Sequence, residues 1–276
     1  MRLLLYALIA VAVVYLAMLL AAWRMQERIV WQPPRLAVAP AGGARRIDYR
    51  SDDGQPLFAY LVGHLEDARG LIISFHGNAD LAAWTVPWAA DVARRTGWAV
   101  LVPEYRGYGG LPGSPDYLAS RRDARATFRV AREQLKADER RLALHGHSLG
   151  SAVAAELAAE HAPAVLILES PFTSAREMAR RMMLPLAAAW PLAGRVHFDT
   201  RARVAELAVP TWVAHGARDG VIPVEMGRSV HASARVPGDL LVVPAGGHND
   251  LRDVAGESYW RWLGRALDAA GARRER

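Results

Sequence analysis

The sequence predicts an α/β protein with a mostly parallel eight-stranded sheet and helices on both of its faces. Short apolar segments such as Leu71–Phe75 alternate with longer amphipathic segments such as Tyr117–Leu135 over most of the chain. Strands buried on both faces read as continuous apolar runs, whereas surface helices keep a polar face, so the alternation indicates parallel strands joined by helices. Before it, Arg46–Arg50 and Leu57–His64 flank the turn sequence Asp52-Asp53-Gly54, which predicts a hairpin at an antiparallel edge.

The first apolar segment, Leu3–Trp23, is long enough to cross a bilayer. It contains no charged residue, and at about 1.5 Å per residue it spans roughly 30 Å, the thickness of the hydrocarbon core. A cleaved signal peptide has a shorter apolar region, and Leu20-Ala21-Ala22 makes a poor cleavage site. We therefore expect an uncleaved transmembrane anchor at residues 1–24, with a cleaved signal or a buried helix as the alternatives.

Residues 25–44 are rich in Pro and Gly and show no periodicity, which predicts a linker between the anchor and the domain. Positive charge flanks the anchor on both sides: the amino terminus and Arg2 precede it, and Arg24, Arg28 and Arg35 follow it. This charge difference is too small to decide on which side of the membrane the domain lies. We expect a single-pass protein of the bacterial inner membrane, its topology left open.

Residues 45–272 are expected to form one domain, because a chain of 276 residues with 52% hydrophobic residues can bury one large core. The later strands are expected at Leu71–Phe75, Trp98–Val102, Arg141–His145, Val165–Leu168, Thr211–Ala214 and Leu240–Val243. The helices are expected at Leu81–Arg95, Tyr117–Leu135, Ser151–Glu160, Val224–Ala234 and Asp253–Ala270.

Residues 174–198 interrupt this alternation, because they are too long for a simple connection between a strand and a helix. They include Met178, Met182 and Met183, and methionine suits surfaces that adapt to varied apolar groups. Two interpretations stay open: an amphipathic helix packed on the core, or a small lid or acyl-binding wall over a cleft.

Composition excludes several kinds of chemistry. The chain has no cysteine, so it has no disulfide, no thiolate metal site and no cysteine nucleophile. Its net charge of +6 would suit a nucleic-acid partner, but the basic residues are dispersed and no basic stripe interleaved with aromatic residues occurs. We therefore expect no nucleic-acid partner.

The pentapeptide Gly146-His147-Ser148-Leu149-Gly150 has the G-x-S-x-G pattern of a nucleophile elbow. A strand is predicted just before it and a helix just after it, which is the context that this motif requires. The sharp turn would hold Ser148 in a strained backbone conformation and project its hydroxyl into a cleft. Ser148 is therefore the candidate nucleophile.

A serine hydroxyl needs a base to take its proton, and the base needs an acid to orient it. In folds built around such an elbow, the acid and then the base follow the serine along the chain. Asp219 and His248 meet this order, and each follows a predicted strand. Glu169, at the end of another strand, is the alternative acid, and His147 is expected to point away from the nucleophile.

Acyl transfer also needs two donors aimed at the oxyanion. The backbone N–H of Leu149 begins the helix after the elbow and is one candidate. The backbone N–H of Asn78, in the loop after Leu71–Phe75, is the other. This chemistry needs no metal and no organic cofactor.

The motifs together resemble the α/β-hydrolase superfamily over roughly residues 45–270. Beyond the elbow, the matching segments are Phe75-His76-Gly77-Asn78-Ala79, Glu104-Tyr105-Arg106-Gly107-Tyr108-Gly109, Glu169-Ser170-Pro171-Phe172-Thr173-Ser174, His215-Gly216 with Asp219, and Gly247-His248-Asn249-Asp250. The chain looks like the branch of membrane-anchored serine hydrolases related to monoacylglycerol lipases, serine aminopeptidases and depalmitoylating thioesterases. This resemblance implies the same site residues and agrees with an N-terminal membrane helix. The depalmitoylating members carry a cysteine-rich, lipidated amino terminus, which this chain lacks.

The expected reaction is hydrolysis of a carboxylic ester or thioester through an acyl-enzyme intermediate on Ser148. The anchor and the methionine-rich segment favour a small-molecule or lipid ester as substrate. Two other functions stay open. A peptidase would use the same three residues, with Glu104 or Glu169 to bind a free amine, and a membrane-anchored scaffold would use none of them. The oligomeric state is not indicated by the sequence.

Overall fold

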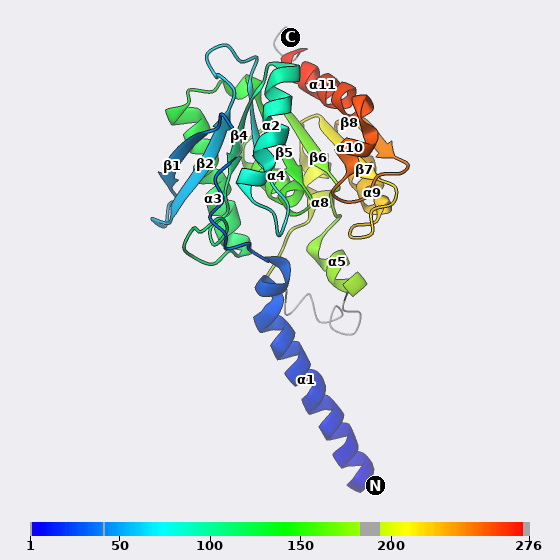
Figure 1. The fold of residues 1–276 in the computed structure, drawn as a ribbon. Helices are drawn as coiled ribbons and strands as arrows, with labels where there is room; N and C mark the ends of the chain where they lie inside the picture. The colour runs from blue at the N-terminus through cyan, green and yellow to red at the C-terminus, as the bar shows by residue number, and fades with distance from the viewer. Residues whose placement is uncertain (1, 41, 183–193, 273–276) are drawn as a thin grey trace.

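A single eight-stranded sheet forms the centre of the domain in the computed structural model, which describes residues 2–40, 42–182 and 194–272 (Figure 1). Its order is β1-β2-β4-β3-β5-β6-β7-β8. The strands are β1 Arg45–Arg50, β2 Pro56–Val62, β3 Leu71–Phe75, β4 Ala99–Pro103, β5 Leu142–His147, β6 Val165–Glu169, β7 Thr211–Gly216 and β8 Pro237–Val243. Strand β2 is antiparallel to β1 and β4, and all pairs from β4 to β8 are parallel. The predicted fold class is confirmed.

Helices cover both faces of this sheet. They are α2 Ala82–Thr96, α3 Tyr117–Arg129, α4 Leu149–Glu160, α5 Ala175–Met182, α8 Thr200–Glu206, α9 Val224–Ser233, α10 Leu251–Ala255 and α11 Glu257–Ala272. Successive strand residues point to opposite faces. In β3, Leu71 and Ile73 therefore pack in the core beneath α3, α4, α8 and α9, whereas Ile72 packs beneath α2, α10 and α11.

The helical segments differ from the predicted ones in three places. Helix α3 ends at Arg129 and continues as a π-helical turn, Val130–Gln134, followed by a 3-10 turn, Glu139–Arg141. The last predicted helix is divided into α10 and α11 at Gly256, whose φ of +51° breaks the helix. Within 174–198, α5 occupies the first part, and residues 183–193 of the predicted lid lie outside the described residues.

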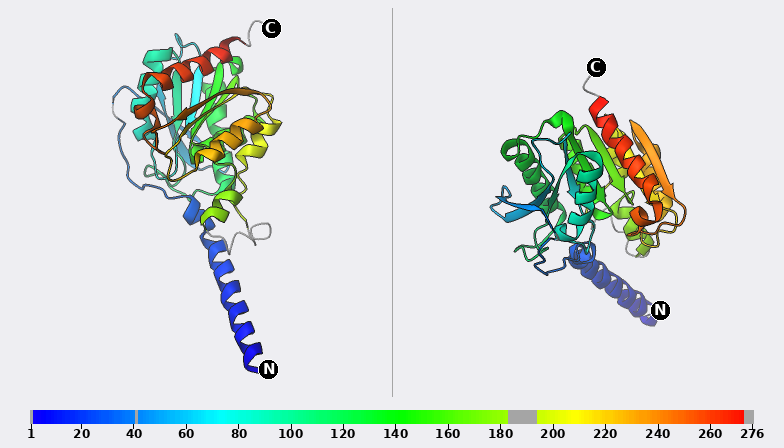
Figure 2. Two further views of the ribbon diagram at one scale, coloured as in Figure 1. Left: turned by 90° about the vertical axis from the view of Figure 1, so that its right-hand side faces the viewer. Right: turned by 45° about the horizontal axis from the view of Figure 1, so that its top comes forward.

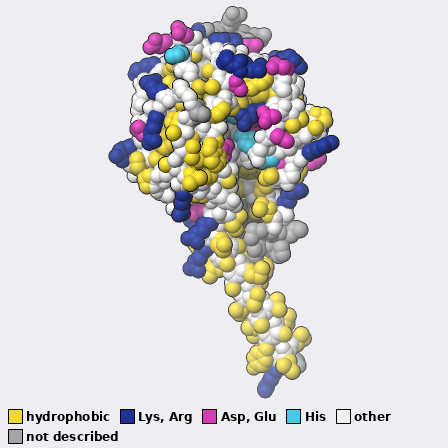
Figure 3. Space-filling view, viewed as in Figure 1, with side chains coloured by type: hydrophobic (Ala, Val, Ile, Leu, Met, Phe, Trp, Pro, Cys, Tyr) yellow, Lys and Arg dark blue, Asp and Glu magenta, His cyan; other side chains and the backbone are white. Residues whose placement is uncertain are grey.

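The N-terminal helix α1, Arg2–Val30, projects from one end of the domain (Figures 1 and 2). Its 29 residues would extend about 44 Å at 1.5 Å per residue. None of its most apolar 18-residue window is buried against the domain, so it is not a core helix. The side chains on its projecting part are mostly hydrophobic (Figure 3). Among the described helices, this is the one that is long and apolar enough to cross a membrane.

The segment expected as a linker at 25–44 begins as helix and then packs on the domain. Helix α1 continues to Val30, because its last turns find partners: Gln26 is buried, and its Oε1 accepts a hydrogen bond of 2.7 Å from the backbone N–H of Arg195. Trp31 is only 3% exposed and packs edge-on against Tyr105. Further along, the Pro34 carbonyl accepts from the Gly109 N–H at 3.1 Å. These contacts fix the direction of α1 relative to the sheet.

Candidate active site

The turn between β5 and α4 has the geometry of a nucleophile elbow. Ser148 has φ of +53° and ψ of −117°, a region that residues with a Cβ rarely adopt. The neighbouring glycines allow the chain to pack this closely. A Cβ on Gly146 would lie 2.1 Å from the Gly150 carbonyl oxygen, and a Cβ on Gly150 would lie 2.1 Å from the carbonyl oxygen of Phe75 on β3.

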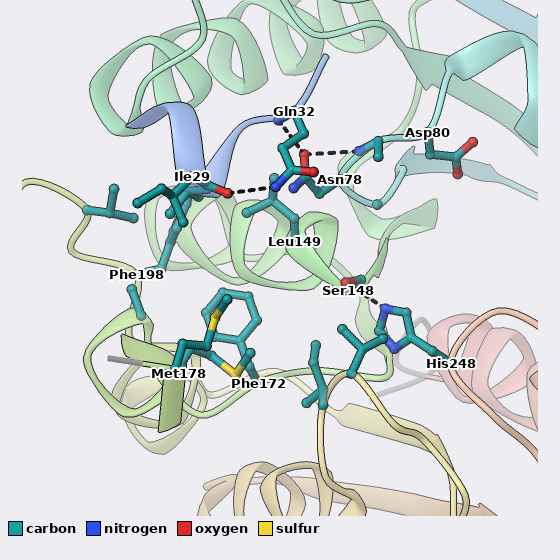
Figure 4. Close-up of a pocket in the computed structure, with 18 of the residues that line it drawn as sticks. Ile29, Gln32, Asn78, Asp80, Ser148, Leu149, Phe172, Met178, Phe198 and His248 are labelled. Atoms are coloured by element: carbon teal, nitrogen blue, oxygen red, sulfur yellow. Dashed lines mark hydrogen bonds between the residues drawn. The ribbon is translucent and has the colours of Figure 1, made fainter. Parts of the chain in front are cut away.

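Loops after three parallel strands bring Ser148, His248 and Asp219 together. Ser148 Oγ lies 3.0 Å from His248 Nε2, and His248 Nδ1 lies 2.7 Å from Asp219 Oδ2 (Figure 4 shows the first contact). Because the Nδ1–H of His248 is donated to the carboxylate, its Nε2 is left to accept from the serine hydroxyl. Asp219 follows β7 and His248 follows β8, at the sheet edge where the carboxyl ends of parallel strands meet.

The carboxylate of Asp219 is fully buried and accepts several hydrogen bonds. Its Oδ1 accepts from the backbone N–H groups of Val221 and Ile222, both at 2.8 Å. Its Oδ2 lies 3.3 Å from His215 Nε2 in addition to its contact with His248. Burial alone would raise the pKa of Asp219, but the two histidines and the backbone donors hold this pKa far below its ordinary value. Asp219 is therefore ionised throughout the neutral pH range.

Asn78 and Leu149, the two predicted oxyanion donors, line the same cavity as Ser148. The N–H of Leu149 belongs to the first turn of α4, where a helix offers no acceptor of its own. The side chain of Asn78 is fixed by three donors. Its Oδ1 accepts from the Ala79 N–H at 3.0 Å, the Gln32 N–H at 2.9 Å and the Tyr108 hydroxyl at 2.7 Å. Gln32, two residues beyond the end of α1, is thus hydrogen-bonded directly to the loop after β3.

Glu169, the alternative acid, lies in a different cluster. Its Oε1 accepts from the Tyr259 hydroxyl and lies 3.0 Å from His145 Nε2, and His145 Nδ1 contacts Ser74 Oγ at 2.8 Å. Burial would raise the pKa of Glu169, but the neighbouring His145, followed by Arg252 and His147, lowers it to about 2. No contact between Glu169 and the side chain of His248 occurs among the described residues.

His147 lies closer to the site than the sequence pattern predicted. It borders the cavity, and its Nε2 donates to the backbone carbonyl of His248 at 3.0 Å. Burial, followed by the neighbouring His248, lowers the pKa of His147 to about 4, so its ring is neutral near pH 7. His147 thus holds the loop that carries His248. Only its position next to Ser148 could have suggested this role.

A cavity of about 720 Å³ extends from Ser148 to the end of α1. This size is within the range of small-molecule sites, roughly 300–1,000 Å³. Figure 4 shows Phe172, Met178 and Phe198 on its apolar side and Ser148 with His248 at the other end. The α1 residues that line it are Leu19, Ala22, Trp23, Gln26, Ile29 and Val30. Hydropathy alone could not identify these residues, because a helix face that lines a cavity is as apolar as one that faces lipid.

No group of three or more His, Asp or Glu side chains in the described ranges is arranged to hold a metal ion. The polar groups next to Ser148 instead bond to one another and to the backbone, as described above for Asp219, His248 and His147.

Known proteins resemble this chain in sequence and in fold. A family model described as serine aminopeptidase, S33, matches residues 66–201, a range that ends before Asp219. The alpha/beta hydrolase domain-containing protein WAV2 of Arabidopsis thaliana is 30% identical over 264 residues, covering 86% of this chain and 85% of the relative.

Two solved structures share the fold at low sequence identity. An esterase of Pyrococcus furiosus is 17% identical with a TM-score of 0.68, covering 86% of this chain and 95% of that chain. A bacterial membrane phospholipase A, described as a virulence factor, is 19% identical with a TM-score of 0.60, covering 96% and 97%. By its sequence relatives and its fold, the chain belongs to the α/β-hydrolase superfamily.

Proposed function

We propose that this protein is a serine hydrolase that cleaves a carboxylic ester or thioester through an acyl-enzyme on Ser148. The observation that carries this proposal is the hydrogen-bonded series Ser148–His248–Asp219 at the end of a cavity of about 720 Å³. Family membership supports the same class of reaction, because hydrolysis is the common chemistry of this fold with an intact elbow.

Each residue has a defined role in the proposed reaction. His248 Nε2 takes the proton of Ser148 as its Oγ attacks the substrate carbonyl, and Asp219 stabilises the imidazolium that forms. The oxyanion accepts hydrogen bonds from the backbone N–H groups of Asn78 and Leu149. His248 then gives its proton to the leaving alcohol or thiol. A water molecule, deprotonated by His248, releases the acyl group in the second half of the reaction.

A peptidase is the second candidate, because the matching family model is described as a serine aminopeptidase. Such an enzyme binds a free amine with a carboxylate near the nucleophile. The carboxylate of Glu104 contacts His76 Nε2 at 2.9 Å, and that of Glu169 contacts His145, so both candidates already have buried partners. Asp80 lines the cavity, but its Oδ1 accepts from the Leu81 N–H. The apolar lining around Phe172 and Met178 favours an acyl group over an amine.

We further propose that α1 is an uncleaved single-pass anchor, in the bacterial inner membrane. Its exposed apolar surface supports membrane insertion. Cleavage near Leu20-Ala21-Ala22 would remove Leu19 and Ala22 from the cavity wall, so the same cavity supports retention of the helix over a cleaved signal.

The nucleophile assignment is tested with a fluorophosphonate probe and p-nitrophenyl butyrate. Wild-type protein is expected to be labelled and to hydrolyse the ester, and Ser148→Ala is expected to do neither. Equal labelling of Ser148→Ala would exclude Ser148 as the nucleophile, and an unlabelled wild type would favour a non-catalytic scaffold. Aminoacyl p-nitroanilides measured in parallel distinguish the peptidase, which would cleave them at least as fast as the ester.

A further inference from the structure

We propose that the membrane helix itself forms the acyl-binding wall, so that the substrates are long-chain acyl esters which enter from the bilayer. This inference rests on the proposed function and names its substrate class. It requires three properties of the structure: an apolar face of α1 turned to the cavity, a second apolar wall, and a cavity that reaches the level of the membrane.

The α1 residues that line the cavity form one face of the helix. Leu19, Ala22, Trp23, Gln26, Ile29 and Val30 have the spacing i, i+3, i+4, i+7, i+10 and i+11. The adjacent Leu20 and Ala21 are exposed on the other side. The one polar side chain in this face, Gln26, is occupied, because its Oε1 accepts from the Arg195 N–H. Apart from Gln26, the α1 residues that line the cavity are therefore apolar.

Helix α5 provides the second wall. Ala175, Met178, Ala179 and Met182 line the same cavity and again have the spacing i, i+3, i+4 and i+7. The arginines of this helix, at 176, 180 and 181, are exposed instead. Methionine side chains are flexible and adapt to varied apolar surfaces. Two apolar helix faces thus border a single space that ends at Ser148, as an extended acyl chain requires.

The cavity reaches the depth of the bilayer surface. A helix needs about 20 apolar residues to cross the hydrocarbon core, which is the length of Leu3–Trp23. Leu19 and Ala22 belong to the last turns of that run and also line the cavity. Arg24 and Arg28 follow it and are exposed, as expected for the headgroup region. The part of the cavity that Leu19 and Ala22 line therefore lies where lipid chains begin.

Docking of α1 keeps this wall in place. In addition to the contact between Gln26 and the Arg195 N–H, the guanidinium of Arg195 lies 3.1 Å from the Glu27 carboxylate and 5.1 Å from the centre of the Trp23 ring. Because these contacts lie at the boundary between membrane and domain, the helix cannot swing away from Ser148 without breaking them.

The test uses full-length protein in phosphatidylcholine vesicles and two esters with the same leaving group. p-Nitrophenyl butyrate is taken up from water, and p-nitrophenyl palmitate is embedded in the vesicles. Ala22→Trp places a large side chain in the wall, and Ala21→Trp places the same side chain on the exposed face. We expect Ala22→Trp to lower kcat/KM for the palmitate by about tenfold or more and for the butyrate by less than about twofold, because only the long chain passes this position. Ala21→Trp is expected to change neither.

A variant on the opposite wall controls for the possibility that Ala22→Trp acts by misfolding the anchor. Met178→Trp leaves α1 untouched and is expected to show the same selective loss toward the palmitate. If Ala22→Trp and Met178→Trp both hydrolyse the palmitate at the wild-type rate, the wall is not an acyl subsite. If the wild type hydrolyses the butyrate but not the embedded palmitate, the substrate class is wrong while the hydrolase proposal stands. If the wild type hydrolyses neither ester and resists the fluorophosphonate, the proposed function itself fails.

Discussion

At the scale of single residues, two buried carboxylates near the elbow have different partners. Asp219 contacts His248, whereas Glu169 contacts His145 and Tyr259. A carboxylate that orients the base affects the chemical step, because it fixes the tautomer of the histidine. A buried carboxylate away from the base affects stability, because replacing it weakens the buried hydrogen bonds that it accepts. Substitution of Asp219 is therefore expected to lower mainly kcat, and substitution of Glu169 mainly the free energy of unfolding.

We expect Asp219→Asn to lower kcat by about 10⁴-fold with little loss of stability, because the amide favours the wrong tautomer of His248. Glu169→Gln is expected to lower kcat by less than about threefold and the free energy of unfolding by about 1–3 kcal/mol, because a charged acceptor in a buried hydrogen-bond cluster becomes a neutral one. Ester hydrolysis and urea unfolding of both variants check this. The reverse pattern, with the larger kcat loss in Glu169→Gln, would assign the acid to Glu169.

At the scale of elements, the elbow depends on close contact between α4 and β3. A Cβ on Gly150 would meet the Phe75 carbonyl at 2.1 Å, whereas a Cβ on Gly264, inside α11, would meet nothing within 4 Å. The same substitution is therefore expected to have opposite effects on stability. Alanine has less conformational freedom to lose than glycine in a helix, so it stabilises where space allows.

Gly150→Ala is expected to lower the free energy of unfolding by about 3 kcal/mol or more, because the backbone of β3 or α4 must shift. Gly264→Ala is expected to raise it by about 0.5–1 kcal/mol. Chemical denaturation of the two variants measures both values, and Gly264→Ala controls for the substitution itself. A Gly150→Ala protein as stable as the wild type would contradict the tight packing of the elbow.

At the scale of the whole molecule, stability is expected to fall with decreasing pH in two steps. His147 has a folded-state pKa of about 4 against an ordinary value of 6.5. Between these values the unfolded chain binds a proton that the folded protein excludes, so acid favours unfolding. Glu169 has a folded-state pKa of about 2 against 4.5, and the pKa of Asp219 also lies far below its ordinary value, so a second loss follows below pH 4.5.

Thermal unfolding followed from pH 7.5 to pH 3 measures this dependence. The Tm of the wild type is expected to decrease from about pH 6.5 downward. His147→Asn, which retains a donor for the His248 carbonyl without titrating, is expected to flatten the profile between pH 6.5 and pH 4 and to leave the lower step unchanged. An identical profile in His147→Asn would show that His147 does not carry the first step.

Local patterns predicted much of the fold. The apolar strands and amphipathic helices indicated the sheet and its two covered faces, since both depend on short-range periodicity. The elbow, with Asp219 and His248 after it, could be placed because the order of these residues follows from chain topology; their catalytic roles stay predictions.

Contacts distant in sequence could not be predicted. The bond between Gln32 and Asn78, the contact of His147 with the His248 loop and the cavity-facing stripe of α1 all depend on how separate elements meet. Hydropathy shows that one face of α1 is apolar, but it does not show whether lipid or the domain contacts that face.

The proposed membrane anchor, docked as α1 is, also changes what substrate concentration means in an assay of this protein. An enzyme held at a bilayer by a fixed helix meets a lipid ester by lateral diffusion in two dimensions. Its rate then follows the mole fraction of that ester among the surrounding lipids, and dilution with inert lipid lowers it even when the bulk amount is constant. The same proposal predicts that the apolar chains of detergent micelles compete with the substrate for the cavity that α1 and α5 line. Under the proposed function, the kinetic constants are therefore expressed against the mole fraction of the ester in the membrane.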